Sequence, residues 1–416
     1  MLRAVLYSLL GVDTSNFPHF QSTATSPLQF PNVFGGQGAY LANCNTPGTI
    51  PAGAVVSPSC PGYRRANDEH LKDPRVIQWN ASIEQTLDAS TVFRLLYNGS
   101  HTTQLIYSPD LKQVQPNTVG YQALTATPAL RQQNLKYPNF SEVLTRDNGP
   151  SAKYQALTVE LQRRYGHNLT FDASYTWAHN LSNALGSAPS SLIGQGGQGD
   201  NGPNTLDYYD IHRDYGNDNF TRRNRFVNTF VYSLPFGRGQ KFLGADSRGL
   251  DLLIGEWNMT SITLLQSGAF LTPTFSPVGG GDLSGTNPGQ RSAGGYQRPD
   301  CLSGVDPNSR STPGNYFNAN AFGVPANNVG RFGNCPVGFL HGPGTTVFSA
   351  TIGKAFAVSD RVNLRYEAAF ANLFNIENLG VPDTRITDSN FGVISGVQNQ
   401  EQAGPRTIQM SLRLSF

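Results

Sequence analysis

Apolar and polar residues alternate along much of the chain, and this alternation constrains the fold more than any other feature. Between Val76 and Leu87 the odd positions carry Ile77, Trp79, Ala81, Ile83 and Leu87, and polar residues stand between most of them. A period of two residues places successive side chains on opposite faces of a β-strand. No apolar run approaches the ~18 residues of a transmembrane helix. A helical membrane protein is excluded, whereas a membrane β-barrel is not, because its signal is alternation.

Nine segments fit the strand pattern. They are residues 76–87, 93–97, 157–161, 169–177, 225–234, 256–266, 345–356, 361–372 and 407–416. The first two are joined by a turn at 88–90 and the next two by a turn at 165–168, which predicts two β-hairpins. Asn228 and Thr263 weaken the alternation in the fifth and sixth segments. Residues 2–9 are a candidate for a tenth strand.

The connections between these strands alternate in length. Short links at 88–90, 165–168, 235–254 and 357–360 alternate with long ones at 108–151, 181–221, 271–344 and 373–406. Outer-membrane barrels have short periplasmic turns and long extracellular loops, whereas a soluble sandwich has no reason to separate its loops in this way. The predicted fold class is therefore all-β, an antiparallel transmembrane β-barrel over residues 75–416. A loop-rich segment, 1–74, precedes it and is expected on the extracellular side.

The composition narrows the functional classes. Charged residues make up 14% of the chain, against ~25% in soluble proteins. The 30 basic and 28 acidic residues are interspersed and give a net charge of +2, so no basic stripe offers itself to nucleic acid. The apolar stretch 4–12 has the character of a signal-peptide core, but no small-residue cleavage site follows it.

The four cysteines fall in two local pairs. Cys44 and Cys60 share one Gly/Pro/Asn-rich stretch, and Cys301 and Cys335 share another. The spacing is not C-x-x-C and no histidine cluster lies nearby, which disfavours a metal site. Two disulfides within extracellular loops, Cys44–Cys60 and Cys301–Cys335, are expected in an oxidising compartment. Four free thiols in a cytosolic protein are the alternative.

Residues for catalysis are not grouped in the sequence. The seven histidines are scattered, and no nucleophile–base arrangement can be recognised from spacing. We therefore expect no enzyme activity and no cofactor. One acidic segment stands out, with Asp207, Asp210, Asp214 and Asp218 among tyrosines. It is a candidate contact site for calcium or sugar, although it lacks the spacing of a calcium loop; a solvated extracellular loop is the alternative.

The polar faces of the expected strands define candidate lumen residues. Alternation places Glu160, Gln162, Arg164 and Asp172 on the inner face of one hairpin, and Asn363, Arg365 and Glu367 on that of another. Opposite charges on neighbouring strands can pair across such a face. The alternative for each residue is that it only solvates the lumen.

Several short segments, in order, resemble the carboxyl-terminal barrel of TonB-dependent transporters of the Oar-like group. They are Asp73–Asn80, Tyr97–His101, Ser174–Ala178, Arg225–Val227, Leu234–Gly239, Phe370–Asn375 and Leu412–Phe416. The 9 to 10 strands expected here would then be part of a 22-stranded barrel, as the resemblance implies. The signal peptide, TonB box and plug of that family are not recognisable here. We therefore expect either part of a longer protein or a barrel that closes with fewer strands.

The last strand resembles the insertion signal that the bacterial barrel-assembly machinery recognises. Its apolar positions are Ile408, Met410, Leu412, Leu414 and the terminal Phe416. An ordinary edge strand of a soluble sheet is the alternative, although such strands more often end in charge or proline.

The resemblance implies an outer-membrane transport protein that takes part in energy-coupled passage of a bulky solute. Its expected partners are outer-membrane lipid, the barrel-assembly machinery, the TonB complex acting through a plug absent from this chain, and a sugar, peptide or siderophore as solute. A secreted or surface-displayed β-rich binding protein, such as an adhesin or carbohydrate-binding protein, is the alternative. Extraction behaviour separates the two, because only the barrel requires detergent.

Overall fold

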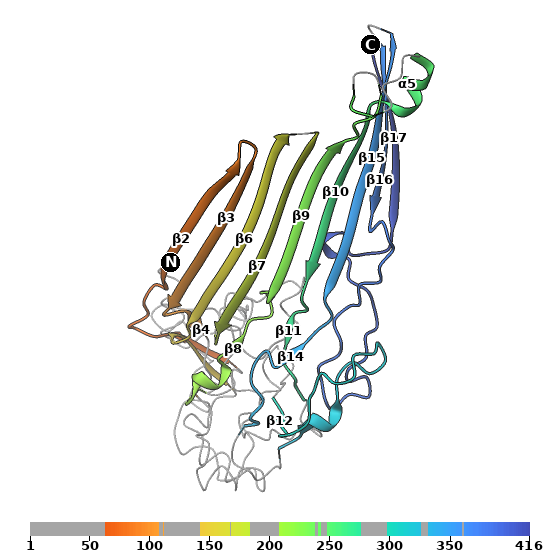
Figure 1. Ribbon diagram of the computed structural model, residues 1–416. Helices are drawn as coiled ribbons and strands as arrows, with labels where there is room; N and C mark the ends of the chain where they lie inside the picture. Colours follow the sequence, from red (N-terminus) through yellow and green to blue (C-terminus); the bar gives the residue numbers. More distant parts are fainter. Residues whose placement is uncertain are drawn as a thin grey trace, which may run out of the picture.

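One antiparallel β-sheet dominates the computed structural model (Figure 1). The structure describes residues 63–107, 111, 142–166, 168–183, 208–237, 240–242, 248–275, 298–325, 332–359 and 362–416. Nine long strands pair with their neighbours in chain order, and a short strand, β8, extends the edge of β7. The nine are β2 (Arg75–Asp88), β3 (Thr91–Thr103), β6 (Ala152–Gly166), β7 (Leu169–Ser182), β9 (Asn224–Ser233), β10 (Trp257–Gln266), β15 (Thr345–Ser359), β16 (Val362–Ala371) and β17 (Thr407–Ser415). All nine expected strands are thereby confirmed.

The strands differ from expectation mainly in length. Strand β3 runs to Thr103 and β6 starts at Ala152, whereas the sequence predicted only 93–97 and 157–161. The additional residues pair in register across β3 and β6. The outer-face positions of this stretch carry Gly99, His101 and Thr103 in place of apolar residues, while the backbone pairing continues through it.

Short and long connections lie at opposite ends of the sheet (Figure 1). The β2–β3, β6–β7 and β15–β16 links are tight. The β9–β10 link contains a helix, α5 (Arg248–Ile254), that the sequence did not predict. Among the described residues no helix is long and apolar enough to cross a membrane.

Small elements lie within the long connections. They are β1 (Tyr63–Asn67), β4 (Ile106–Tyr107), β5 (Glu142–Asn148), β8 (Gly216–Asn217), β11 (Phe270–Leu271), β12 (Asp300–Cys301), β13 (Phe322–Gly323), β14 (Leu340–His341) and the short 3-10 helices η2 (Ile211–Asp214), η5 (Ala319–Ala321) and η6 (Gln400–Gln402). Strand β1 pairs in parallel with β5, so the end of the 1–74 segment joins the β3–β6 connection. The candidate strand 2–9, the stretch 4–12, Cys44 and Cys60 lie outside the described residues.

The strand register keeps the alternating residues of all nine strands on two distinct faces of the sheet. Tyr175 pairs with Val159 and Phe226, whereas its neighbour Ser174 pairs with Glu160 and Val227. We call the side of Tyr175 the outer face and that of Ser174 the inner face. Large apolar side chains on the outer face remain exposed, including Ile83 (65%), Trp177 (45%), Met410 (66%) and Leu412 (67%). No described element covers them, which is the arrangement expected of a lipid-facing surface.

The two polar residues that interrupt the predicted alternation are direct neighbours on adjacent strands. Asn228 pairs with Thr263, and both belong to the outer face. The two interruptions therefore occupy one site on the sheet rather than two.

On the outer face, the indole ring of Trp79 lies so close to the backbone of residue 99 that this position requires glycine. Gly99 stands directly opposite Trp79, and a Cβ atom at position 99 would lie 2.2 Å from the indole Nε1. The ring packs over bare backbone, a contact that any larger residue would prevent.

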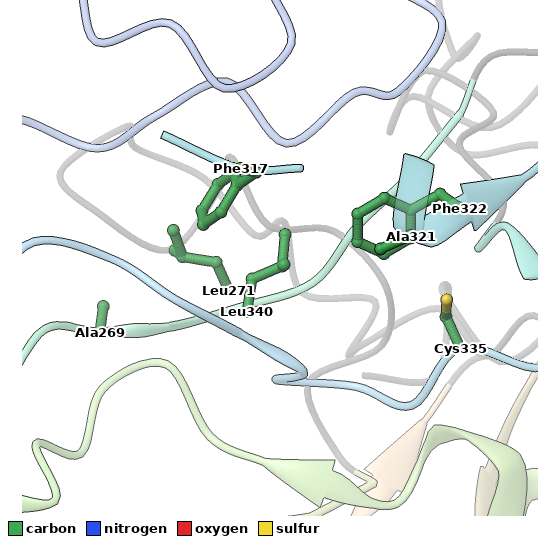
Figure 2. Packing of buried hydrophobic residues seen from close by; sticks show 7 residues of the cluster. All are labelled: Ala269, Leu271, Phe317, Ala321, Phe322, Cys335 and Leu340. Atoms are coloured by element: carbon green, nitrogen blue, oxygen red, sulfur yellow. The ribbon is translucent and has the colours of Figure 1, made fainter. Parts of the chain in front are cut away.

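The long connections fold into a second body, which we call the loop cap and which comprises the described residues of the β7–β9 and β10–β15 connections and of the β16–β17 connection up to residue 397. Its core contains Ala269, Leu271, Phe317, Ala321, Phe322, Cys335 and Leu340 (Figure 2). Ile386 and Phe391 of the β16–β17 connection pack against this cluster. The cap is therefore held by apolar packing between connections that are distant in sequence.

Candidate functional site

The inner face carries a network of paired polar side chains. Arg94 lies between two carboxylates, with Nε 2.5 Å from Oε2 of Glu84 and Nη1 3.1 Å from Oε1 of Glu160. On the next rows Gln162 donates to Asp172 over 3.2 Å. The hydroxyls of Thr158 and Thr176 share a hydrogen bond of 2.9 Å. Neighbouring strands thereby satisfy one another's polar groups on a face that can contact water.

The predicted lumen residues fall into three groups. Glu160, Gln162 and Asp172 share the inner face and take part in this network. Arg365 and Glu367 occupy the same face of β16, where Nη2 and Oε1 lie 2.6 Å apart. Arg164 is not brought into the network: the register shifts between Arg163 and Gly166, and its exposed side chain lies at the turn.

Sequence reasoning missed Arg94 and Glu84, although a signal existed. Each lies four residues from the 88–90 link, and a register shift between Thr86 and Asp88 leaves them directly opposite each other. Gln162 and Asp172 are opposite each other in the next hairpin, beyond a register shift between Arg163 and Gly166.

Part of the β16–β17 connection folds down onto the inner face. Oε1 of Glu401 accepts from Nη2 of Arg225 over 2.6 Å, and Oε2 accepts from Nε2 of Gln266 over 3.1 Å. Oγ of Ser349 donates to Gln402 over 2.7 Å. Ala403 is buried against Leu264 and Val347. We call residues 398–404 the inner-face segment; it narrows the space in front of β9, β10 and β15.

The backbone of the inner-face segment is strained where it contacts the sheet. Glu401 and Gln402 have φ angles of 52° and 62°. Consecutive non-glycine residues in the left-handed region cost free energy and persist only where contacts hold them. The hydrogen bonds of these two side chains supply such contacts.

Hydrogen bonding from Arg225 lowers the pKa of the Glu401 carboxyl, and Gln266 contributes in the same direction. A lowered folded-state pKa means that the contact is fully present above pH 4.5. It is lost as the pH falls through the folded-state pKa. The inner-face segment is thus anchored at neutral pH and released only in acid.

We predict that Glu401→Gln mobilises the inner-face segment at neutral pH. The effect is modest, up to ~1 kcal/mol, because both charged side chains are partly exposed. A spin label at Gly404 should report faster motion in the variant. Glu377→Gln, an exposed residue of the same connection, is the matched control. Equal label mobility in Glu401→Gln and the parent chain would contradict the anchoring role.

The acidic segment does not gather into one site. Asp214 forms a buried ion pair with Arg298, with Oδ1 and Nη1 2.6 Å apart. Asp218 accepts from Asn180 and from the backbone N–H of Phe220, and burial raises the pKa of its carboxyl. Asp210 caps η2 by accepting from the backbone N–H of His212. Asp207 lies outside the described residues.

These contacts change the interpretation of the acidic segment. Asp214 and Asp218 hold the loop cap together, so their oxygens are directed at protein partners. Among the described residues, no three Asp, Glu, His or Cys side chains are grouped as a metal site would require.

A disulfide joins Cys301 and Cys335 in the loop cap, as the sequence predicted. The backbone N–H of Cys335 donates to the carbonyl of Pro299, over 3.0 Å. Cys44 and Cys60 fall outside the described residues, so their pairing stays a prediction.

The apolar positions of the last strand lie together on the outer face. Ile408, Met410, Leu412 and Leu414 pair with outer-face residues of β16, and Phe416 is 98% exposed. Within the part of the chain that the structure describes, the strand is an exposed edge with one apolar side.

The fold and its two faces agree with a family assignment. The profile of the outer membrane beta barrel domain family matches residues 7–409. The chain belongs to this family, and the protein is a β-barrel protein of the bacterial outer membrane. No curated protein matches its sequence.

Several solved transporter structures are similar in fold. The outer membrane transporter YddB from Escherichia coli is 6% identical, with a TM-score of 0.43, and the match covers 85% of this chain and 34% of that one. The pyoverdine receptor FpvA from Pseudomonas aeruginosa is 10% identical (TM-score 0.39; 83% and 30% covered). The iron transporter FrpB from Neisseria meningitidis is 9% identical (TM-score 0.35; 84% and 32% covered). The chain spans about a third of the length of these proteins.

Proposed function

We propose that the chain forms part of the wall of a TonB-dependent transporter of the Oar-like group, which passes a bulky solute through a larger barrel. The observation that carries the proposal is the meander of nine strands with an apolar outer face and a hydrogen-bonded polar inner face. Within the described residues, no strand pairs with the free edge of β2 or β17. Unpaired backbone groups cost several kcal/mol each in lipid, so further strands are needed to complete such a wall.

The number of strands in the proposed barrel follows from the size of the solute that it would pass. Barrels of 22 strands accommodate a plug and a large solute path, whereas barrels of 8 strands are filled by their own side chains. The energy for transport would come from the inner membrane through the TonB complex acting on a plug. That plug belongs to the remainder of the proposed transporter.

The loop cap supports a role in solute capture. Tyr209, Tyr215 and Phe220 are exposed on it at 44%, 37% and 55%. Aromatic rings next to Asn and Asp side chains suit a sugar, a peptide or a siderophore. The inner-face segment, held by Glu401, would then lie on the path between the cap and the lumen.

Membership of an outer-membrane barrel family favours this proposal over a secreted binding protein. The two differ in energy dependence as well as in location: a transporter moves solute only when the TonB complex is active, whereas a binding protein retains it at the surface.

Uptake by intact cells tests the proposal. Cells that produce the full-length protein are given a fluorescent maltooligosaccharide, a labelled peptide or a radiolabelled iron(III)–siderophore. We expect uptake of at least one probe to require both this protein and TonB. The proposal would be overturned if no probe showed uptake that is lost both when this protein is deleted and when TonB is deleted.

The barrel-assembly machinery is a further proposed partner, through the last strand. Deleting Phe416 or replacing it with Asp should leave synthesis intact but lower the amount of heat-resistant, membrane-integrated protein, because the terminal aromatic is lost from the interface. Gln409→Asp introduces the same charge on the inner face of β17 and is the control. Undiminished integration of both Phe416 variants would argue against an insertion signal.

A further inference from the structure

Helix α5 lies at the end of the sheet where the short turns are found (Figure 1), and Lys354 of β15 contacts the residue that follows it. The helix belongs to the β9–β10 connection and leads into β10 through Gly255 and Glu256. The φ angle of Glu256 is 56°, so the junction between the helix and the strand uses a left-handed residue. In the outer-membrane layout this end faces the periplasm.

Two hydrogen bonds place the carboxyl end of α5 over the outer face of the sheet. Nε1 of Trp257 donates to the carbonyl of Leu253 over 3.0 Å. Nζ of Lys354 donates to the carbonyl of Gly255. Trp257 and Lys354 are cross-strand partners and lie two residues from Met259 and Ile352 on the same face. The helix therefore ends on the apolar side of the sheet.

The buried lysine gives a physical reason for this placement. Lys354 stands on the outer face yet is only 2% exposed. Its Nζ lies 4.9 Å from the ring centroid of Trp257 and 5.1 Å from that of Phe356. A lysine exposed to lipid is destabilising, whereas a cation close to helix carbonyls and aromatic rings is favourable. The end of α5 thus covers a charge that lipid would otherwise contact.

Apolar side chains are exposed on this connection, beside exposed Gln240, Lys241 and Glu256. Leu252 and Leu253 are 38% and 71% exposed, and Phe242 of the same connection is 48% exposed. Asp251 is directed toward the protein, because its Oδ1 lies against the backbone at Gly237 and Gly255. The helix consequently turns the Asp251 carboxylate inward and Leu252 and Leu253 outward.

We propose that α5 lies in the periplasmic leaflet of the outer membrane, with Leu252 and Leu253 among the phospholipid acyl chains near the headgroups. The surface that it presents continues the apolar outer face, and helices with leucines on one side bind at such interfaces. Trp257 occupies the level where aromatic rings favour the membrane boundary. The inference rests on the outer face contacting lipid, which is part of the proposed function.

Depth-dependent quenching tests the location of α5. A bimane label is placed at Leu253→Cys in the full-length protein, folded into phosphatidylethanolamine–phosphatidylglycerol vesicles containing brominated lipid. Leu157→Cys on the outer face and Val381→Cys in the loop cap are labelled in parallel; both positions are exposed in the structure. The chain without an added cysteine gives the background.

We expect the label at 253 to be quenched most by bromines close to the headgroups, the label at 157 by bromines deeper in the chains, and the label at 381 only by aqueous iodide. If brominated lipid quenches the label at 157 while iodide quenches the label at 253, the helix location alone is overturned. The helix would then contact solvent or a periplasmic protein. Shielding of 253 from both quenchers would also overturn it and indicate contact with a second copy. Absence of lipid quenching at 157 would reject the membrane orientation of the proposed function itself.

Discussion

Replacing Asp214 with Asn is expected to destabilise the loop cap by about 3–5 kcal/mol, because the change leaves a buried guanidinium without its counter-charge. The side chains of Arg298 and Asp214 are 2% and 1% exposed. Arg298 also donates through Nη2 to the carbonyl of Arg213, over 2.7 Å. That bond remains in the variant but does not neutralise the charge. The rate at which protease cleaves the cap in the folded protein measures the change.

Two variants make this expectation specific. The double change Asp214→Leu with Arg298→Met removes both charges and should recover much of the lost stability, since a buried pair is often replaceable by apolar residues. Asp388→Asn breaks the ion pair with Arg385, whose atoms are 3.0 Å apart and whose side chains are about a third exposed. Its effect should stay within ~1 kcal/mol. Protease resistance of Asp214→Asn equal to that of Asp388→Asn would refute the structural role of the buried pair.

An arginine at position 173 should destabilise the folded barrel by roughly 2–4 kcal/mol, whereas an arginine at position 174 should be nearly neutral. Ala173 lies on the outer face between Phe171 and Tyr175, opposite Leu161 and Asn228. Ser174 lies on the inner face directly opposite Glu160. A cation at 173 meets lipid, while one at 174 gains an acidic neighbour.

Unfolding by urea in phospholipid vesicles, followed by the heat-dependent gel shift, measures both variants. Ala173→Leu controls for side-chain volume and should cost little on an uncovered apolar face. Equal loss of stability in Ala173→Arg and Ser174→Arg would reject the assignment of the two faces. That result would equally remove the basis for placing the outer face in lipid.

Sequence alone determined the sheet. Alternation is a local property, because each residue in a strand faces opposite to its neighbour whatever lies elsewhere in the chain. The nine strands, the two faces and the separation of short turns from long connections could therefore be predicted. The pairing of Gln162 with Asp172 depends in addition on the register shift between Arg163 and Gly166, which alternation does not predict.

Only the tertiary structure decided the contacts of the long connections. Asp214 and Arg298 are 84 residues apart, and Arg225 and Glu401 are 176 apart. No periodicity relates such pairs, because they meet only when the sheet has brought the loop ends together. The sequence therefore indicated Asp214 as a candidate ligand residue, whereas in the structure it forms a buried ion pair with Arg298. Helix α5 was not predicted for a related reason. Seven residues are too few to show helical periodicity, and the position of the helix depends on Trp257 and Lys354 of the folded sheet.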